Sequence, residues 1–217
     1  MKAFTQLLIL ADGRFPSGGH AHSSGLEAAV AHGRVRDLDG LRAFLRGRLH
    51  TGGLVAAAFA AAACARPEAI EELEAELDAR TPAPALRLAA RRQGRSLRRA
   101  ARVVWPGEDA HWAAAVSQPV ALGVAARAAG LTPDEAALLA AYHAISGPAS
   151  AAVRLLGLDP YRVHALLAEL GDECDEVARE AATHARGPAA DLPAASAPLL
   201  DVSAEDHAAW EVRLFAS

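Results

Sequence analysis

Alanine dominates the apolar residues of this 217-residue chain, and that limits the folds the chain can adopt. Apolar residues make up 52% of the sequence, aromatic residues only 5%, and isoleucine is rare. Alanine is the strongest helix former, whereas the residues that favour strands are β-branched or aromatic. We therefore predict an all-α fold, and the length suits a single helical domain.

Start signals divide the chain into about eight helices. The clearest lies from Thr132 to Glu135, where a threonine cap, a first-turn proline and a glutamate complete a capping box. Asp37 and Asp159 stand in cap positions before apolar runs. Residues 24–27, Ser-Gly-Leu-Glu, fit a second capping box. We expect these helices to pack as one bundle over residues 1–186.

The longest apolar run, residues 52–65, follows a predicted bend at Gly52-Gly53. It is shorter than the roughly 20 residues of a bilayer-spanning helix, so it predicts a buried central helix and no membrane contact. No signal peptide is predicted, because the N-terminal apolar run meets charged residues early. Cys64 and Cys174 are far apart, as is typical of reduced core thiols. We expect a soluble protein of the cytoplasm.

The charged residues exclude several functions. The formal net charge of −4 shows no basic excess, which argues against a nucleic-acid partner. Lys2 is the only lysine, so a Walker A loop, a Schiff-base lysine and a lysine general base are all excluded. No arrangement of nucleophile, base and orienting acid emerges. We therefore expect no catalytic site.

Two consecutive predicted helices carry opposite charges. An acidic helix after Pro67 is followed by one whose arginines fall within a sector of roughly 140° at about 100° per residue. Either these arginines pair with the acidic helix in a hairpin, or they form a docking face for an acidic protein partner. They are Arg87, Arg91, Arg92, Arg95, Arg98, Arg99 and Arg102. A linker with His111 and Trp112 follows.

A glycine-rich loop, residues 18–25, carries His20 and His22. An exposed row of N–H groups before a helix can hold an anion, but the lysine of a phosphate loop is missing, so a structural turn is the simpler explanation. Imidazole suits nickel, zinc and copper, which makes these two histidines weak candidates for a metal site. Their two-residue spacing has no partner cysteine, and we predict no resident metal.

The last part of the chain, residues 187–217, is rich in proline and alanine and is predicted to be an extended tail. Its final residues are apolar and costly to leave in water. They must dock either on the core of this chain or on a partner. These apolar residues are Trp210, Val212, Leu214 and Phe215.

Five groups of residues carry motifs: residues 7–11 with 15–27, Arg92-Gln93-Gly94, Pro119 with Gly123, residues 151–159, and Arg213-Leu214-Phe215-Ala216-Ser217. Together they extend along nearly the whole chain and resemble the UreF family of urease accessory proteins. The motif with a glycine and two histidines resembles an actinobacterial-like branch. Ser117 occupies the place of a family histidine, and Phe15 that of a leucine.

The resemblance implies a non-catalytic chaperone that forms a homodimer and binds the accessory protein UreD, also called UreH, and the GTPase UreG. Their complex would engage apo-urease and promote nickel insertion, with UreD held by the tail. Nickel is then cargo, GTP is bound by the partner, and no cofactor is intrinsic to the chain. The implied partner-binding residues are Gly18, Gly19, His20, His22, Gly25, Glu27, Arg92, Gln93, Gly94, Arg213, Leu214 and Phe215.

Two competing hypotheses remain open at this point. The first is a nickel-binding carrier that uses His20 and His22, together with Cys64 or Cys174. The second is a helical enzyme whose site is assembled from distant residues, which would require a deep polar pocket with titratable groups.

Overall fold

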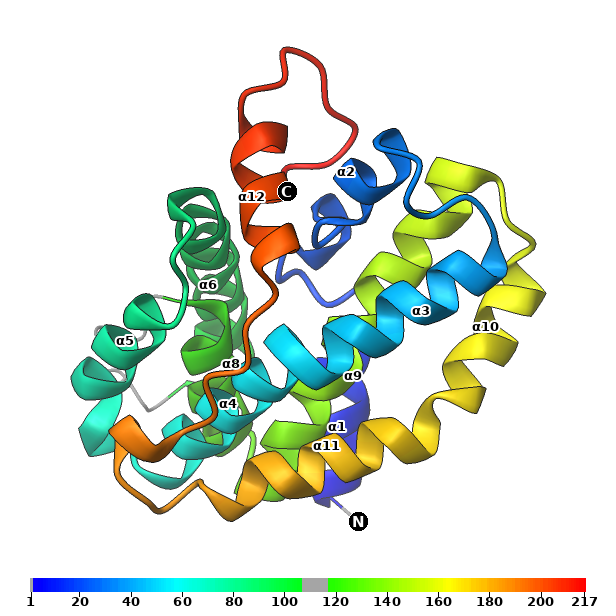
Figure 1. The fold of residues 1–217 in the computed structure, drawn as a ribbon. Coiled ribbons are helices and arrows are strands. Elements are labelled where there is room, and N and C mark those ends of the chain that lie inside the picture. Colours follow the sequence, from blue (N-terminus) through cyan, green and yellow to red (C-terminus); the bar gives the residue numbers. More distant parts are fainter. Residues whose placement is uncertain (1, 107–116) are drawn as a thin grey trace.

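The computed structural model describes residues 2–106 and 117–217, so the linker residues His111 and Trp112 lie outside it. The described residues form helices, turns and loops without a strand (Figure 1), which confirms the all-α prediction. The α-helices are α1 (Lys2–Ala11), α2 (Leu26–Ala31), α3 (Leu38–Arg48), α4 (Leu54–Ala65), α5 (Ile70–Ala79), α6 (Pro84–Val104), α8 (Gln118–Ala128), α9 (Pro133–Leu156), α10 (Pro160–Glu169), α11 (Gly171–Thr183) and α12 (Pro198–Ala208).

Helix α4 lies at the centre of the bundle and packs against α8, α9 and α11. Nearly every residue from Ala57 to Cys64 is buried, including the ring of Phe59. Small alanine side chains let neighbouring helices approach closely. At Gly123 in α8 the approach is so close that a Cβ atom would lie 2.2 Å from the Ala60 carbonyl oxygen. The alanine content therefore determines how this core is packed.

The predicted bend at Gly52-Gly53 is a single π-helical turn, Leu49–Gly53, between α3 and α4. A Cβ atom on Gly53 would lie 3.0 Å from the Arg48 carbonyl oxygen and 3.2 Å from the Ala144 Cβ. Glycine at this position thus lets α9 pass close to the turn. In Figure 1, α3 and α4 run across the molecule as one bent rod.

Capping residues in the sequence predicted most helix starts correctly. The capping box is complete at the start of α9, where Glu135 N–H donates to Thr132 Oγ1 at 3.2 Å and Thr132 N–H donates to Glu135 Oε2 at 2.7 Å. Asp37 and Asp159 also cap their helices. The single helix expected after Asp159 is divided into α10 and α11, and Gly171, a poor helix former, begins the second.

Two helical stretches, Leu38–Ala65 and Pro133–Leu156, are long and apolar enough to cross a membrane by length and composition alone. Inside the bundle, 67% and 61% of their most apolar windows are buried. We interpret both as core helices, because their apolar faces are covered by other helices of the same chain. The residue 52–65 segment is buried at the centre, as predicted.

The expectation of an extended tail needs one correction, because Pro198–Ala208 forms helix α12. Pro198 occupies the first turn, where a missing N–H costs no hydrogen bond, so this proline starts a helix instead of preventing one. The residues before α12 follow the surface of the bundle, and the Arg80 guanidinium donates to the Ala190 and Leu192 carbonyl oxygens at 2.9 and 3.2 Å. Figure 1 shows α12 rising beside α2 and α6.

Candidate functional site

The glycine-rich loop, residues 18–25, takes backbone conformations that explain its composition. Gly18 and Gly25 have φ angles of +79° and +89°, in the left-handed region that favours glycine. Ser24 lies in the same region with a φ of +57°, which is uncommon for a residue with a side chain. The loop is therefore tightly turned where it meets α2.

The capping box predicted for Ser24 and Glu27 does not form. Gly25 precedes α2, and no side chain caps the helix from that position. Instead, Ser23 Oγ accepts the Glu27 N–H at 3.1 Å. The Glu27 side chain does not turn back to the cap, because distant N–H groups occupy its carboxylate.

Glu27 is a buried carboxylate that holds the tail. It accepts hydrogen bonds from the main-chain N–H groups of Leu214 at 2.8 Å and Phe215 at 3.0 Å, and the His207 Nε2 lies 2.9 Å from it. Burial alone would raise the pKa of the Glu27 carboxyl, but these three donors outweigh it and the pKa is lowered. Glu27 is therefore held in its ionised form.

The loop and the last residues of the tail also bond through their main chains. Ser23 N–H donates to the Ser217 main-chain oxygen at 2.7 Å, and Ala216 N–H donates to the Ala21 carbonyl oxygen at 2.7 Å. The His22 Nδ1 lies 2.7 Å from Ser217 Oγ. We call this set of bonds, between residues 21–27 and residues 207–217, the loop–tail contact.

Arg154 of α9 completes the loop–tail contact. Its guanidinium lies 4.4 Å from the centre of the Phe215 ring and donates to the His20 carbonyl oxygen at 3.0 Å. Phe215 is only 4% exposed, whereas Leu214 and Val212 are 74% and 84% exposed. Of the two alternatives for the apolar tail residues, Phe215 therefore docks on its own chain, while Leu214 and Val212 remain at the surface.

The structure brings the three predicted partner-binding motifs to one place. A hollow of about 60 Å³ is lined by Gly25 of the loop, Arg92 of α6 and Arg213 of the tail, together with His207 and Ser217. Gly94 is buried within α6, and Gln93 lines a neighbouring cavity. Sequence reasoning missed His207 and gave no role to Arg154, although Arg154 stands in one of the motifs that carry the resemblance.

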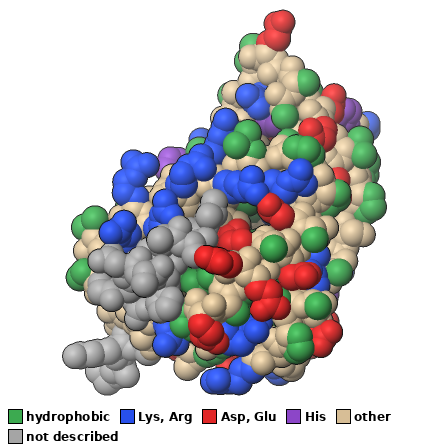
Figure 2. Space-filling view, turned by 90° about the vertical axis from the view of Figure 1, so that its left-hand side faces the viewer, with side chains coloured by type: hydrophobic (Ala, Val, Ile, Leu, Met, Phe, Trp, Pro, Cys, Tyr) green, Lys and Arg blue, Asp and Glu red, His purple; other side chains and the backbone are tan. Residues whose placement is uncertain are grey.

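The arginines of α6 differ in whether they pair with the acidic helix α5 or remain exposed. Arg91 forms an ion pair with Asp78 of α5, and Arg87 donates to main-chain oxygens of the connecting loop. Arg92, Arg95 and Arg99 are exposed and have no hydrogen bond or ion pair within the part of the chain that the structure describes. Figure 2 shows a basic band above an acidic cluster on this side of the molecule. We call Arg92, Arg95 and Arg99 the arginine surface.

The two loop histidines do not form a metal cluster with the cysteines. His20 is exposed, whereas His22 is buried, and this burial, aided by the Arg92 charge, lowers the pKa of His22. Cys64 and Cys174 are buried elsewhere in the core, where desolvation raises the pKa of each thiol to about 11. Among residues 2–106 and 117–217, no group of three or more His, Cys, Asp or Glu side chains is arranged to hold a metal ion.

A cavity of about 540 Å³ lies beside the loop and is lined by four histidines: His20, His22, His143 and His164. The His143 Nε2 lies 3.1 Å from the Leu10 carbonyl oxygen, and burial lowers the pKa of His143. Nothing in the sequence indicates that His143 and His164 lie beside His20 and His22, because more than 100 residues separate the two pairs.

Comparison with known proteins agrees with these motifs. The family model described as UreF matches residues 35–171. A protein of Mycobacterium sp. strain JLS named urease accessory protein UreF is 50% identical over the full length of both chains. Proteins with the same name are 49% identical over the full length of both chains in Mycolicibacterium vanbaalenii, and 43% identical over 95% of both chains in Mycobacterium tuberculosis. The chain therefore belongs to the UreF family of urease accessory proteins, which serve the maturation of urease and are not themselves enzymes.

Proposed function

We propose that this protein is a cytoplasmic scaffold for urease maturation, which binds UreD (UreH) and the GTPase UreG and brings them to apo-urease for nickel insertion. In this role it works as a homodimer, nickel is the cargo of the complex, and GTP is bound by UreG. The proposed partner-binding residues lie in the glycine-rich loop, the α6 motif and the tail: Gly18, Gly19, His20, His22, Gly25, Glu27, Arg92, Gln93, Gly94, Arg213, Leu214 and Phe215.

The observation that carries the proposal is the apolar surface of the tail. Beyond residue 198, four large apolar side chains are more than half exposed: Leu199, Val202, Val212 and Leu214. Side chains of this size at the surface mark contact sites when they gather in one segment. We define these four residues as the tail surface and infer that UreD covers it.

The loop–tail contact explains how the tail surface is presented. The Glu27 carboxylate fixes the backbone at Leu214, so that its side chain projects outward while Phe215 is anchored inside. A segment that is already ordered loses less conformational entropy on binding than a disordered one. The tail therefore acts as a prearranged surface, in contrast to the extended tail expected from the sequence.

The arginine surface offers a second contact of different chemistry. The planar guanidinium groups of Arg92, Arg95 and Arg99 suit the carboxylates of an acidic protein. Charged surface contacts mainly increase the rate and specificity of association, whereas buried apolar contacts supply most of the affinity. We therefore assign tight capture to the tail surface and orientation of a partner to the arginine surface.

The proposal is tested by the double variant Val212→Asp, Leu214→Asp. Two charges on the tail surface should abolish capture of purified UreD in a pull-down, because a charge is costly to bury at an interface. Both side chains are exposed, so thermal unfolding should change little. Tyr161→Asp is the matched control, since Tyr161 is 87% exposed on α10. Undiminished capture by the double variant would refute the assigned surface.

The alternative function, a nickel carrier that uses His20 and His22, has less support. One ring nitrogen of His22 is engaged by Ser217, and the side chain is only 8% exposed. The two cysteines that were considered as additional ligands are buried in the core. We therefore propose the scaffold in preference to the carrier.

A further inference from the structure

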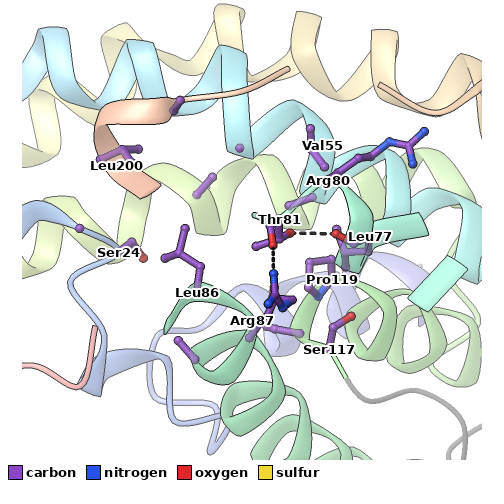
Figure 3. Close-up of a pocket in the computed structure, with 18 of the residues that line it drawn as sticks. Ser24, Val55, Leu77, Arg80, Thr81, Leu86, Arg87, Ser117, Pro119 and Leu200 are labelled. Carbon is purple, nitrogen blue, oxygen red and sulfur yellow. Dashed lines mark hydrogen bonds between the residues drawn. The ribbon is translucent and has the colours of Figure 1, made fainter. Parts of the chain in front are cut away.

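A second cavity, of about 260 Å³, is lined by Ser24 and Gly25 of the loop and is polar at several points. Its other walls come from α3, α4, α5, α6, α8 and α9, from Gly52, and from the tail. Figure 3 shows Val55, Leu77 and Pro119 on one side, with Ser24 and Leu200 on the other.

Arg48 of α3 lines this cavity and lacks a counter-ion. Its Nε donates to the Ala144 carbonyl oxygen at 3.1 Å, which leaves both terminal nitrogens without a partner among the described residues. These nitrogens keep some solvent-accessible surface, and Arg48 lines the cavity. Burial lowers the pKa of Arg48 to about 10, and no carboxylate is close enough to oppose that shift.

The other charged groups of the cavity do not neutralise Arg48. Asp78 pairs with Arg91, and Arg80 pairs with Glu76. Asp201 forms no ion pair with Arg48, and burial raises the pKa of the Asp201 carboxyl.

Arg87 adds a further positive charge to the cavity. Among the described residues, its guanidinium donates only to the carbonyl oxygens of Thr81, at 2.6 Å (Figure 3), and of Pro82, at 2.9 Å. After the internal pairs are taken into account, Arg48 and Arg87 face a single carboxyl group, Asp201, so the cavity carries an excess of positive charge.

We propose that this cavity binds a small oxyanion, a carboxylate or a phosphate, at the free guanidinium nitrogens of Arg48. A guanidinium binds such anions through two parallel N–H donors, and a partly buried cation without a counter-ion favours one strongly. The amides of Gln93 and Gln118 and the Ser24 hydroxyl also line the cavity and offer further donors. This site does not depend on the proposed function, because it uses neither the tail surface nor the arginine surface.

The site is tested by titrating the full chain with sodium acetate and with sodium phosphate at constant ionic strength, using sodium chloride as the reference. Binding to the folded state stabilises it by RT ln(1 + L/Kd), where L is the ligand concentration, so the unfolding temperature rises with the logarithm of that concentration once it exceeds Kd. We expect acetate, phosphate or both to raise the unfolding temperature in this way, with chloride giving no such rise. The acetate and phosphate arms distinguish a planar carboxylate from a tetrahedral phosphate.

Three variants test whether the anion binds at Arg48. Arg48→Gln should weaken the affinity for the anion by about tenfold or more, since a hydrogen bond to a charged group is lost. Arg162→Gln removes the same charge from exposed α10 and should bind as the wild type does. Gly52→Leu keeps Arg48 but places a side chain at the exposed rim, where a Cβ meets nothing within 4 Å, so it should also weaken binding. An equal response of all four proteins, or no response to either anion, would overturn the proposal.

Discussion

Glu27 connects two parts of the chain that are 187 residues apart in sequence. Its carboxylate accepts two main-chain N–H groups and contacts the His207 ring, and the exposed fraction of Glu27 is 7%. No local signal could predict these partners, because a glutamate three residues after a serine normally bonds within its own helix. A single buried carboxylate thus decides where the tail lies.

The substitution Glu27→Gln tests this role. The amide nitrogen of glutamine is a donor that would face other donors, and the charge that holds them would be lost. We expect the free energy of unfolding to fall by about 1.5–3 kcal/mol, the range for hydrogen bonds to a charged group. Urea denaturation measures it. Glu211→Gln, an exposed change in the same tail, should have almost no effect.

The pH dependence of this difference has a definite sign. The folded-state pKa of Glu27 lies below the usual glutamate value of 4.5, so its contribution to stability is fully present above about pH 4.5. As the pH falls through the lowered pKa, Glu27 takes up a proton and the contribution is lost. The stability gap between the wild type and Glu27→Gln should therefore be constant near neutrality and close in acid. A gap that widens in acid would contradict the assignment.

At the scale of elements, the features that can be predicted from the sequence are those that depend on residues close to one another in the chain. The arginine sector of α6, the acidic α5 before it and the capped start of α9 were all identified from spacing. Helix α12 is not predicted from the sequence, because a run of prolines usually indicates an extended chain. Pro198 instead lies in the first turn of α12, where proline is tolerated. The sequence could not predict that Arg91 pairs with Asp78 while Arg92, Arg95 and Arg99 are exposed, since this depends on how α5 and α6 pack.

Helix packing at Gly123 gives a prediction at this scale. A Cβ on Gly123 would lie 2.2 Å from the Ala60 carbonyl oxygen and 2.7 Å from the Ala63 Cβ, so α4 and α8 would have to separate. We expect Gly123→Ala to cost about 1–3 kcal/mol or more, as overpacking of a core does. Thermal or urea unfolding followed by circular dichroism measures this cost.

The control for this substitution is Gly47→Ala in α3. Gly47 is exposed and a Cβ there meets nothing within 4 Å, so alanine should stabilise the helix by about 0.5–1 kcal/mol. The two substitutions make the same chemical change, but their effects on the free energy of unfolding should have opposite signs. Equal effects would show that the close approach of α4 and α8 is not a constraint.

For the whole molecule, the fold class and the family followed from composition and motifs, but the assembly of the site did not. The glycine loop, the α6 motif and the tail are separated in sequence, and they meet at the hollow lined by Gly25, Arg92 and Arg213. That meeting results from packing contacts between residues far apart in the chain. The result is a bundle that holds its own tail in place and presents apolar and basic surfaces beside one another.

The central claim is that this protein acts by holding other maturation proteins together. The most direct measurement is size-exclusion chromatography with light scattering on the full chain mixed with purified UreD and UreG. The account predicts one species that contains all three proteins, with a mass that includes two copies of this chain. Three separately eluting proteins, at concentrations where each is folded, would contradict it.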